Sequence, residues 1–217
     1  MHNLMPDLLR GLLVTVQVTG GAAMVALLAM FIAGTARLSG NWILNKSAQI
    51  YIEIFRGTSA LVQLFWVYFA LPIFGIRLPA MTAGIVVMGL NTGAYAAEVF
   101  RGAVLAVPQT QVEAAVALNM TRSQRLWRIL IPQAMPVVLP PLTNLLIDLL
   151  KNTALVSLIT VHDLTAQAQI LRTENLAATG EIYTSDLLIY FAVALIISAG
   201  MRRAERLFRY THRKAPA

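Results

Sequence analysis

The chain has 217 residues, of which 58% are hydrophobic and only 12% are charged. This composition is typical of a chain solvated mainly by lipid, not of a soluble globular domain. Cysteine is absent, which excludes disulfides, thiolate metal sites and a cysteine nucleophile, and the three histidines show no metal-ligand spacing. The net charge of +7 comes without a basic stripe of interleaved aromatics, so it indicates membrane orientation and not nucleic-acid binding.

Five segments are apolar and long enough to be helices that cross the roughly 30 Å hydrocarbon layer of a bilayer. They are Leu12–Ala36, Ala60–Phe74, Pro79–Phe100, Gln133–Leu150 and Leu187–Met201. The second and fifth apolar runs are short, so we expect them to extend into their polar flanks, Tyr51–Ser59 and Tyr183–Asp186. The sequence therefore predicts an all-α integral membrane protein with about five transmembrane helices in one domain, residues 1–217.

The charges between these spans predict their direction, because Lys and Arg concentrate in cytoplasmic loops. Residues 37–59, residues 101–131 and the tail from Arg202 each carry a net positive charge. The segments that alternate with them are neutral before the first span, weakly positive at Arg77 and negative at 152–186. We therefore expect the N-terminus to face outside and the C-terminus to lie in the cytoplasm.

The chain lacks a nucleotide-binding P-loop. None of its three lysines, Lys46, Lys151 and Lys214, has the glycine context of the G-x-x-x-x-G-K-[ST] motif. We expect no cofactor on this chain, and any ATP that drives it must be bound and hydrolysed by a partner subunit.

The positive segment at 101–131 contains two predicted short helices. Gln111–Leu118 is rich in alanine and has Glu113 in its first turn, where a carboxylate favours the positive end of a helix. Asn119 predicts a left-handed stop, and Thr121 with Gln124 fits a capping box that starts a second helix running to Pro132. Physical reasoning alone leaves two interpretations open, an amphipathic connector on anionic headgroups or a docking element for another protein.

The spacing within this segment favours docking, because it resembles the EAA signature of ABC importer permeases: E-A-A, three residues, glycine, nine residues, I-x-L-P. The matching residues are Glu113, Ala114, Ala115, Asn119, Ile129, Ile131 and Pro132. Two of them depart from the pattern, since Asn119 replaces glycine and Ile131 replaces leucine. The resemblance implies a cytoplasmic coupling loop at about 103–132 whose first helix sits in a cleft of the ATPase.

The residues assigned to this coupling element are Gln111, Glu113, Ala114, Ala115 and Asn119. Plain helix propensity remains an alternative explanation for the two alanines.

Further blocks are similar to the polar amino acid (histidine/glutamine/arginine-type) uptake subfamily of these permeases. They are Phe55–Thr58, Leu61–Gln63, Ala94–Gly102, Val107–Pro108, Lys151–Leu155 and Asp163–Leu164. Departures are Ser59 for proline, Thr110 for glycine and Asn152 for aspartate. Loss of the aspartate makes a strongly cationic solute less favoured.

This resemblance implies the type I importer permease fold in the bacterial inner membrane. It further implies an ATPase dimer, an extracytoplasmic solute-binding protein and a second permease subunit, for which we favour a homologous chain over an identical one. The solute would be a polar amino acid or a related zwitterion, with a compatible solute such as ectoine as the alternative. The chain itself would be a transport subunit with no catalytic residues.

Ionisable residues inside spans are candidates for function, because they are costly in lipid. Glu98 can pair with Arg101, and Asp148 with Lys151, since each pair lies three residues apart on a helix. Asp148 and Lys151 could instead match the two charges of a bound zwitterion, and both interpretations stay open.

Polar uncharged residues in the spans complete the predicted solute pathway. They are Gln63, Asn91, Tyr95 and Asn144, which offer donors and acceptors to a solute but could equally hydrogen-bond a neighbouring helix.

Two other classes compete with the importer subunit. A stand-alone secondary carrier or channel would leave the spacing at 111–132 unexplained. An intramembrane enzyme would need a second aspartate, a Ser/Lys dyad or a metal set beside Asp148, and the sequence offers none inside the spans.

Overall fold

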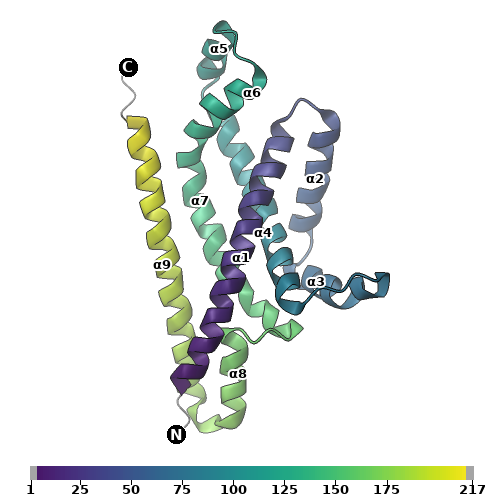
Figure 1. The fold of residues 1–217 in the computed structure, drawn as a ribbon. Coiled ribbons are helices and arrows are strands. Elements are labelled where there is room, and N and C mark those ends of the chain that lie inside the picture. Colours follow the sequence, from purple (N-terminus) through teal and green to yellow (C-terminus); the bar gives the residue numbers. More distant parts are fainter. Residues whose placement is uncertain (1–3, 214–217) are drawn as a thin grey trace.

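The computed structural model describes residues 4–213, and these form helices and short connections with no β-strand (Figure 1). Lys214 of the basic tail, and the ends of the predicted domain 1–217, lie outside the described residues. The α-helices are α1 (Leu4–Leu38), α2 (Trp42–Gly57), α3 (Ala60–Phe65), α4 (Ala80–Leu105), α5 (Gln109–Ala117), α6 (Arg122–Arg125), α7 (Ile131–Asn152), α8 (Leu164–Glu174) and α9 (Thr179–Arg213). Short π-helical and 3₁₀ stretches continue some of them, at Trp66–Ala70, Leu71–Phe74, Leu126–Leu130, Thr153–Ile159 and Leu176–Ala178.

Four stretches of the described chain are long and apolar enough to cross a membrane, and a fifth is possible if α2 and the helix after it count as one broken span. The four are Met5–Leu38, Ala80–Leu105, Arg122–Ile159 and Leu176–Phe208. The expectation of about five spans is thus confirmed, as is the extension of the last span through Tyr183–Asp186.

The predicted second span is wrong as a single straight helix. The chain turns by 105° between α2 and the helix that begins at Ala60. Thr58 and Ser59 have extended backbones, so the helical hydrogen bonds are interrupted in the middle of the predicted span. Gly57 and its two short polar neighbours have low helix propensity, and the sequence-based prediction gave them too little weight.

Helix α4 is the centre of the bundle, and α1 packs along it at very short range. A Cβ added at Gly89 would lie 2.5 Å from Cβ of Val25, and one added at Gly93 would lie 2.6 Å from Cβ of Ala29. Glycines spaced four apart allow two membrane helices to approach closely, and packing at that distance holds them together where lipid gives no hydrophobic drive.

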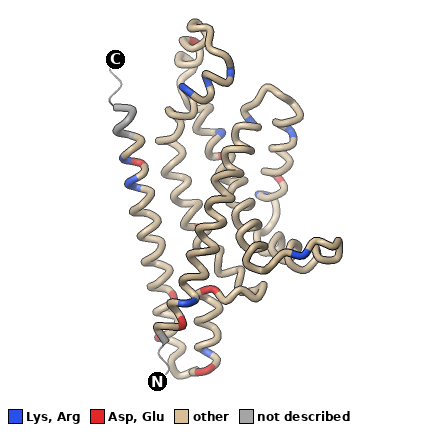
Figure 2. Tube along the Cα trace, in the orientation of Figure 1, with Lys and Arg blue, Asp and Glu red and all other residues tan. Residues whose placement is uncertain are grey.

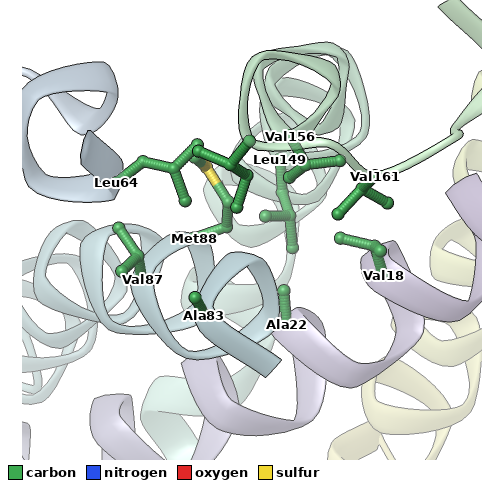
Figure 3. Packing of buried hydrophobic residues seen from close by; sticks show 10 residues of the cluster. Val18, Ala22, Leu64, Ala83, Val87, Met88, Leu149, Val156 and Val161 are labelled. Atoms are coloured by element: carbon green, nitrogen blue, oxygen red, sulfur yellow. The ribbon is translucent and has the colours of Figure 1, made fainter. Parts of the chain in front are cut away.

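A buried cluster joins α1, α3, α4 and the end of α7 (Figure 3). Its labelled members are Val18, Ala22, Leu64, Ala83, Val87, Met88, Leu149, Val156 and Val161. Leu64 is the contribution of α3, and it is fully buried. This contact fixes the direction of the chain after the bend and therefore positions the polar groups around it.

The two ends of the molecule differ in charge. Helices α5 and α6 lie at the same end as the C-terminal part of α9, whereas α8 and the start of α1 lie at the opposite end (Figure 1). Basic residues concentrate at the α5–α6 end, and acidic residues gather around α8, where Arg10 and Arg172 are the basic exceptions (Figure 2).

Candidate functional site

The loop between α4 and α7 has the predicted bend at Asn119. Asn119 has φ 53°, in the left-handed region, and the N–H of Met120 donates to the carbonyl of Ala115 over 3.1 Å. Thr121 then starts α6 with a complete capping box: the N–H of Gln124 donates to Oγ1 of Thr121 at 3.3 Å, and the N–H of Thr121 donates to Oε1 of Gln124 at 2.9 Å. Both sequence predictions about this turn are confirmed.

Two details of this loop differ from expectation. Helix α5 begins at Gln109, directly after Pro108, so Glu113 lies in its second turn and not in the first. The helix that starts at Thr121 also does not stop at Pro132, because a π-helical stretch at Leu126–Leu130 leads without a break into α7. The change in helical spacing directly before Pro132 accommodates the residue that was expected to end the helix.

Helix α5 has an inner and an outer face. Ala115 is 1% exposed and lies against the rest of the protein, whereas Glu113 and Ala114 are exposed together with two apolar residues, Val116 and Leu118. Among the described residues, no hydrogen bond or ion pair is found for the side chain of Glu113. The outer face therefore offers one carboxylate and a small apolar surface to a partner.

A polar pocket of about 370 Å³ lies beside the α2–α3 bend, between α4 and α7. It brings together three of the predicted pathway residues, Asn91, Tyr95 and Asp148. Thr58, Ser59, Thr92 and Asn152 add further polar groups, and Ala60, Leu145 and Leu149 provide apolar walls. The volume lies in the range of small-molecule sites, and seven of the ten lining residues are polar, which suits a polar solute.

Asn91 has a second, structural task. Its Nδ2 donates to the backbone carbonyl of Phe55 at 3.0 Å and to Oε1 of Gln63 at 3.1 Å. Nε2 of Gln63 donates in turn to the Phe55 carbonyl at 2.9 Å and to Oγ1 of Thr58 at 2.7 Å. These side chains therefore satisfy backbone groups that the interrupted helix leaves without a partner.

The other predicted pathway residues do not all reach this pocket. Lys151 pairs with Asp148 at 3.4 Å, as the spacing predicted, but both side chains are more than half exposed. Asn144 is exposed on the same helix and does not line the pocket. Tyr95 does line it, and its hydroxyl donates to the carbonyl of Arg56 at 3.4 Å.

Sequence reasoning missed Thr58, Ser59, Thr92 and Asn152 as pocket residues. The first two follow Gly57 directly before the apolar run that begins at Ala60, so an interrupted helix was the signal that could have revealed them. Asn152 was noticed only as a departure from aspartate.

Glu98 forms the predicted pair with Arg101 at 3.0 Å and a further contact with Arg37 of α1 at 3.6 Å. Arg37 also donates to Oδ1 of Asn45, whose Nδ2 donates to the Arg37 carbonyl at 2.9 Å. This network ties together the ends of α1, α2 and α4 near the coupling loop. In the part of the chain that the structure describes, no group of three His, Asp or Glu residues could hold a metal ion.

Comparisons with known proteins agree with this architecture. Residues 21–214 match the family described as "Binding-protein-dependent transport system inner membrane component". A probable amino-acid ABC transporter permease protein, y4tF, of Sinorhizobium fredii is 47% identical over 210 residues, covering 94% of this chain and 88% of that protein. The glutamine transport system permease protein GlnP of Escherichia coli is 39% identical over 177 residues, covering 81% and 80%.

A solved structure shows the same fold. The crystal structure of an amino acid ABC transporter with histidines matches with a TM-score of 0.84 and 36% identity, over 93% of this chain and 94% of that one. A stand-alone carrier or an intramembrane enzyme is therefore not supported. The chain belongs to the family of binding-protein-dependent transport system inner membrane components, and it is a multi-pass permease subunit of an ABC importer, not itself an enzyme.

Proposed function

We propose that this permease carries a polar amino acid or a related zwitterionic solute through the pocket at the α2–α3 bend. The observation that supports this most directly is the pocket itself, which Asp148 lines together with Asn91 and Tyr95 in a volume of about 370 Å³. The proteins similar to this chain are named for amino acids, glutamine and histidines, which are zwitterions of suitable size. Ectoine, another compact zwitterion, is the alternative solute.

The pocket chemistry suits two opposite charges held close together. Asp148 offers a carboxylate to the ammonium group of the solute, and its contact with Lys151 leaves it accessible because both side chains are more than half exposed. The hydroxyl group of Ser59 can donate to the carboxylate of the solute, whereas the hydroxyl groups of Thr58 and Tyr95 already donate to the backbone carbonyls of Ile54 and Arg56. Gln63 would not contact the solute directly, but would hold Asn91 and the bend in place.

For the coupling loop, we propose that α5 docks into the ATPase dimer by its outer face. Gln111, Glu113, Ala114, Ala115 and Asn119 would form this element, with Ala115 on the inner face as support. Docking in the cytoplasm requires the N-terminus to be outside and the C-terminus inside. The concentration of basic residues at the α5–α6 end supports that orientation (Figure 2).

The family implies a binding-protein partner and an ATPase, and we propose that the second permease is a homologous chain. Residues 1–217 would then act as one transmembrane permease domain within this assembly. Co-purification from the native host would test the proposal, because an identical second copy would give a single permease band.

The pocket is tested by Asp148→Asn in proteoliposomes that contain the whole importer and its binding protein. Loss of a hydrogen bond to a charged group should raise the solute concentration for half-maximal uptake about tenfold or more. Glu53→Gln makes the same chemical change at an exposed position of α2 away from the pocket and should leave uptake unchanged. Equal uptake by Asp148→Asn and by wild type would refute the pocket.

Asn144 remains a candidate of a different kind. Its side chain is exposed in the single chain, and we propose that it enters the pathway only where the second permease packs against α7. Asn144→Ala should then raise the half-maximal concentration in the full assembly.

Coupling is tested by Glu113→Lys. Reversing the charge on the outer face of α5 should weaken ATPase association and reduce solute-stimulated ATP hydrolysis. The control is Glu174→Lys, a charge reversal at another exposed position, on α8 at the opposite end of the molecule. Normal transport by Glu113→Lys would contradict the assignment of α5.

A further inference from the structure

A second pocket, of about 550 Å³, lies on the inner side of the coupling loop. Its walls come from the end of α1 with the turn that follows, the end of α4, the start of α5, and α6 with the π-helical stretch. Val112 of α5 faces this pocket, whereas Glu113 beside it belongs to the outer face. The pocket is therefore separate from the surface proposed to meet the ATPase.

The lining of the pocket has a basic part and an apolar part. Arg122, Ser123 and Arg125 line it from α6, and Leu38, Leu105 and Leu130 are among its apolar walls. A Cβ at Gly40 would collide with Nη1 of Arg122, so glycine lets this guanidinium cross the α1–α2 turn at the edge of the pocket. Within residues 5–208, no acidic partner is found for either arginine.

The pocket lies at the level where an interface between membrane and water is expected. It lies where the long apolar helices α1 and α4 end, and Leu105, one of its wall residues, is 61% exposed. Trp127, on the π-helical stretch that follows the arginines, is 56% exposed, and exposed tryptophan is enriched at the headgroup level of membranes. An occupant at this level meets lipid on one side and water on the other.

We propose that this pocket binds the headgroup of an anionic phospholipid of the cytoplasmic leaflet. Arg122 and Arg125 would bind the phosphate, for which the planar guanidinium is well suited, and an acyl chain would lie along Leu105 and Leu130. The bound lipid would fix the inner side of the coupling loop to the membrane while its outer side holds the ATPase. The proposal rests on the proposed cytoplasmic orientation of this loop.

The test is native mass spectrometry of the whole purified importer in detergent, titrated with phosphatidylglycerol or phosphatidylcholine. The wild type should prefer phosphatidylglycerol. Each arginine replaced by alanine should lower that affinity about fivefold, and Arg122→Ala with Arg125→Ala should lower it about 30-fold. The control pair Arg202→Ala with Arg203→Ala removes two exposed basic residues of α9 outside the pocket, and should keep the preference.

A second variant covers the case in which the double substitution prevents assembly. Ser123 is exposed in the first turn of α6, where aspartate is favourable for a helix, so Ser123→Asp should fold and still repel the headgroup. Three results would overturn the lipid site. They are an equal loss of phosphatidylglycerol affinity in the α9 control, an unchanged phosphatidylglycerol affinity in Ser123→Asp, and displacement of the lipid by inorganic phosphate. So would release of the ATPase from the double variant with lipid binding intact, since the pocket would then serve the ATPase. The two proposals can fail separately. If the arginine variants lose the lipid preference while Glu113→Lys still couples normally, the lipid site is supported and the assignment of α5 to the ATPase is refuted.

Discussion

Two of the bends in the chain are held in different ways. The coupling bend at Asn119 is closed by its own residues: a left-handed asparagine, a backbone hydrogen bond from Met120 and the capping box of Thr121. The 105° bend between α2 and α3 is closed partly by Gln63 of α3, which reaches back to Phe55, and partly from outside by Asn91 of α4. The first bend is purely local, and the second also has tertiary support.

This difference has a functional consequence. A bend built from local contacts can move as a unit with whatever docks on it, which suits a loop that passes motion from one subunit to another. A bend held by a neighbouring helix changes whenever that helix shifts. Because Asn91 both braces the α2–α3 bend and lines the polar pocket, a shift of α4 would alter the bend and the pocket together.

A third turn, before α8, combines local and tertiary support. Among the three, a change in the protonation of this turn should have the largest effect on the free energy of unfolding. Asp163 is fully buried; its Oδ1 accepts from the N–H of Ala166 and its Oδ2 from the hydroxyl of Tyr190 on α9. Burial raises the pKa of Asp163 from 3.8 to about 6, with Asp186 adding to the rise. Between about pH 4 and pH 6, Asp163 is therefore protonated in the folded protein but ionised in the unfolded chain. The free energy of unfolding should fall by roughly 3 kcal/mol as the pH rises through that range.

Thermal unfolding in detergent at several pH values measures this dependence. Asp163→Asn keeps a good N-cap but cannot ionise, so it should be relatively more stable than wild type above pH 6 and should lack this part of the pH dependence. If the two proteins show the same pH profile, Asp163 is not the group responsible.

The second largest effect on stability is expected at the bend between α2 and α3, from the substitution Asn91→Leu. The change removes two hydrogen bonds from a residue that is 9% exposed, which should cost about 2 kcal/mol of stability and loosen the angle between α2 and α3. Because the chain has no cysteine, spin labels at Lys46→Cys and Ile73→Cys can report the bend without further changes. A broader distance distribution is expected. The control is Asn144→Leu, the same substitution at an exposed position of α7, which should keep the narrow distance distribution of the wild type. An unchanged distance distribution in Asn91→Leu would show that the bend is held locally.

The predictability of the fold follows the same division. Long apolar runs identified α1, α4, α7 and α9, because length and hydropathy are properties of a continuous segment. Only the end of helix α2, from Tyr51, was predicted, as the polar flank of the second span, since Trp42–Gly57 mixes lysine, glutamate and asparagine with its apolar residues. The interruption after Gly57 has a local signal in its weak helix formers, but the contact that braces the bend joins Phe55 to Asn91, 36 positions along the chain, and no local pattern contains it.

The candidate sites divide likewise. The coupling loop could be predicted nearly residue by residue, down to the left-handed Asn119, because its signals all lie within about twenty positions. For the pocket, the residue types were predictable but their grouping was not: Asn91, Tyr95 and Asp148 meet, whereas Asn144 points elsewhere. Which polar residues of a span face a common cavity is decided by how four helices rotate against one another. That rotation is set by close contacts such as those of Gly89 and Gly93.

The smallest effect is expected at the local bend, and it should be confined to coupling. Asn119 tolerates φ 53° better than most residues, and Asn119→Val should cost about 1 kcal/mol, because a branched side chain opposes the left-handed conformation. Since the cost falls on the loop alone, the melting temperature of the bundle should hardly change while solute-stimulated ATP hydrolysis falls. Asn119→Gly is the matched control, because glycine accepts this conformation freely and should retain full coupling. A valine variant that couples normally, or a glycine variant that fails, would mean that the side chain of residue 119 matters for a contact and not for the bend.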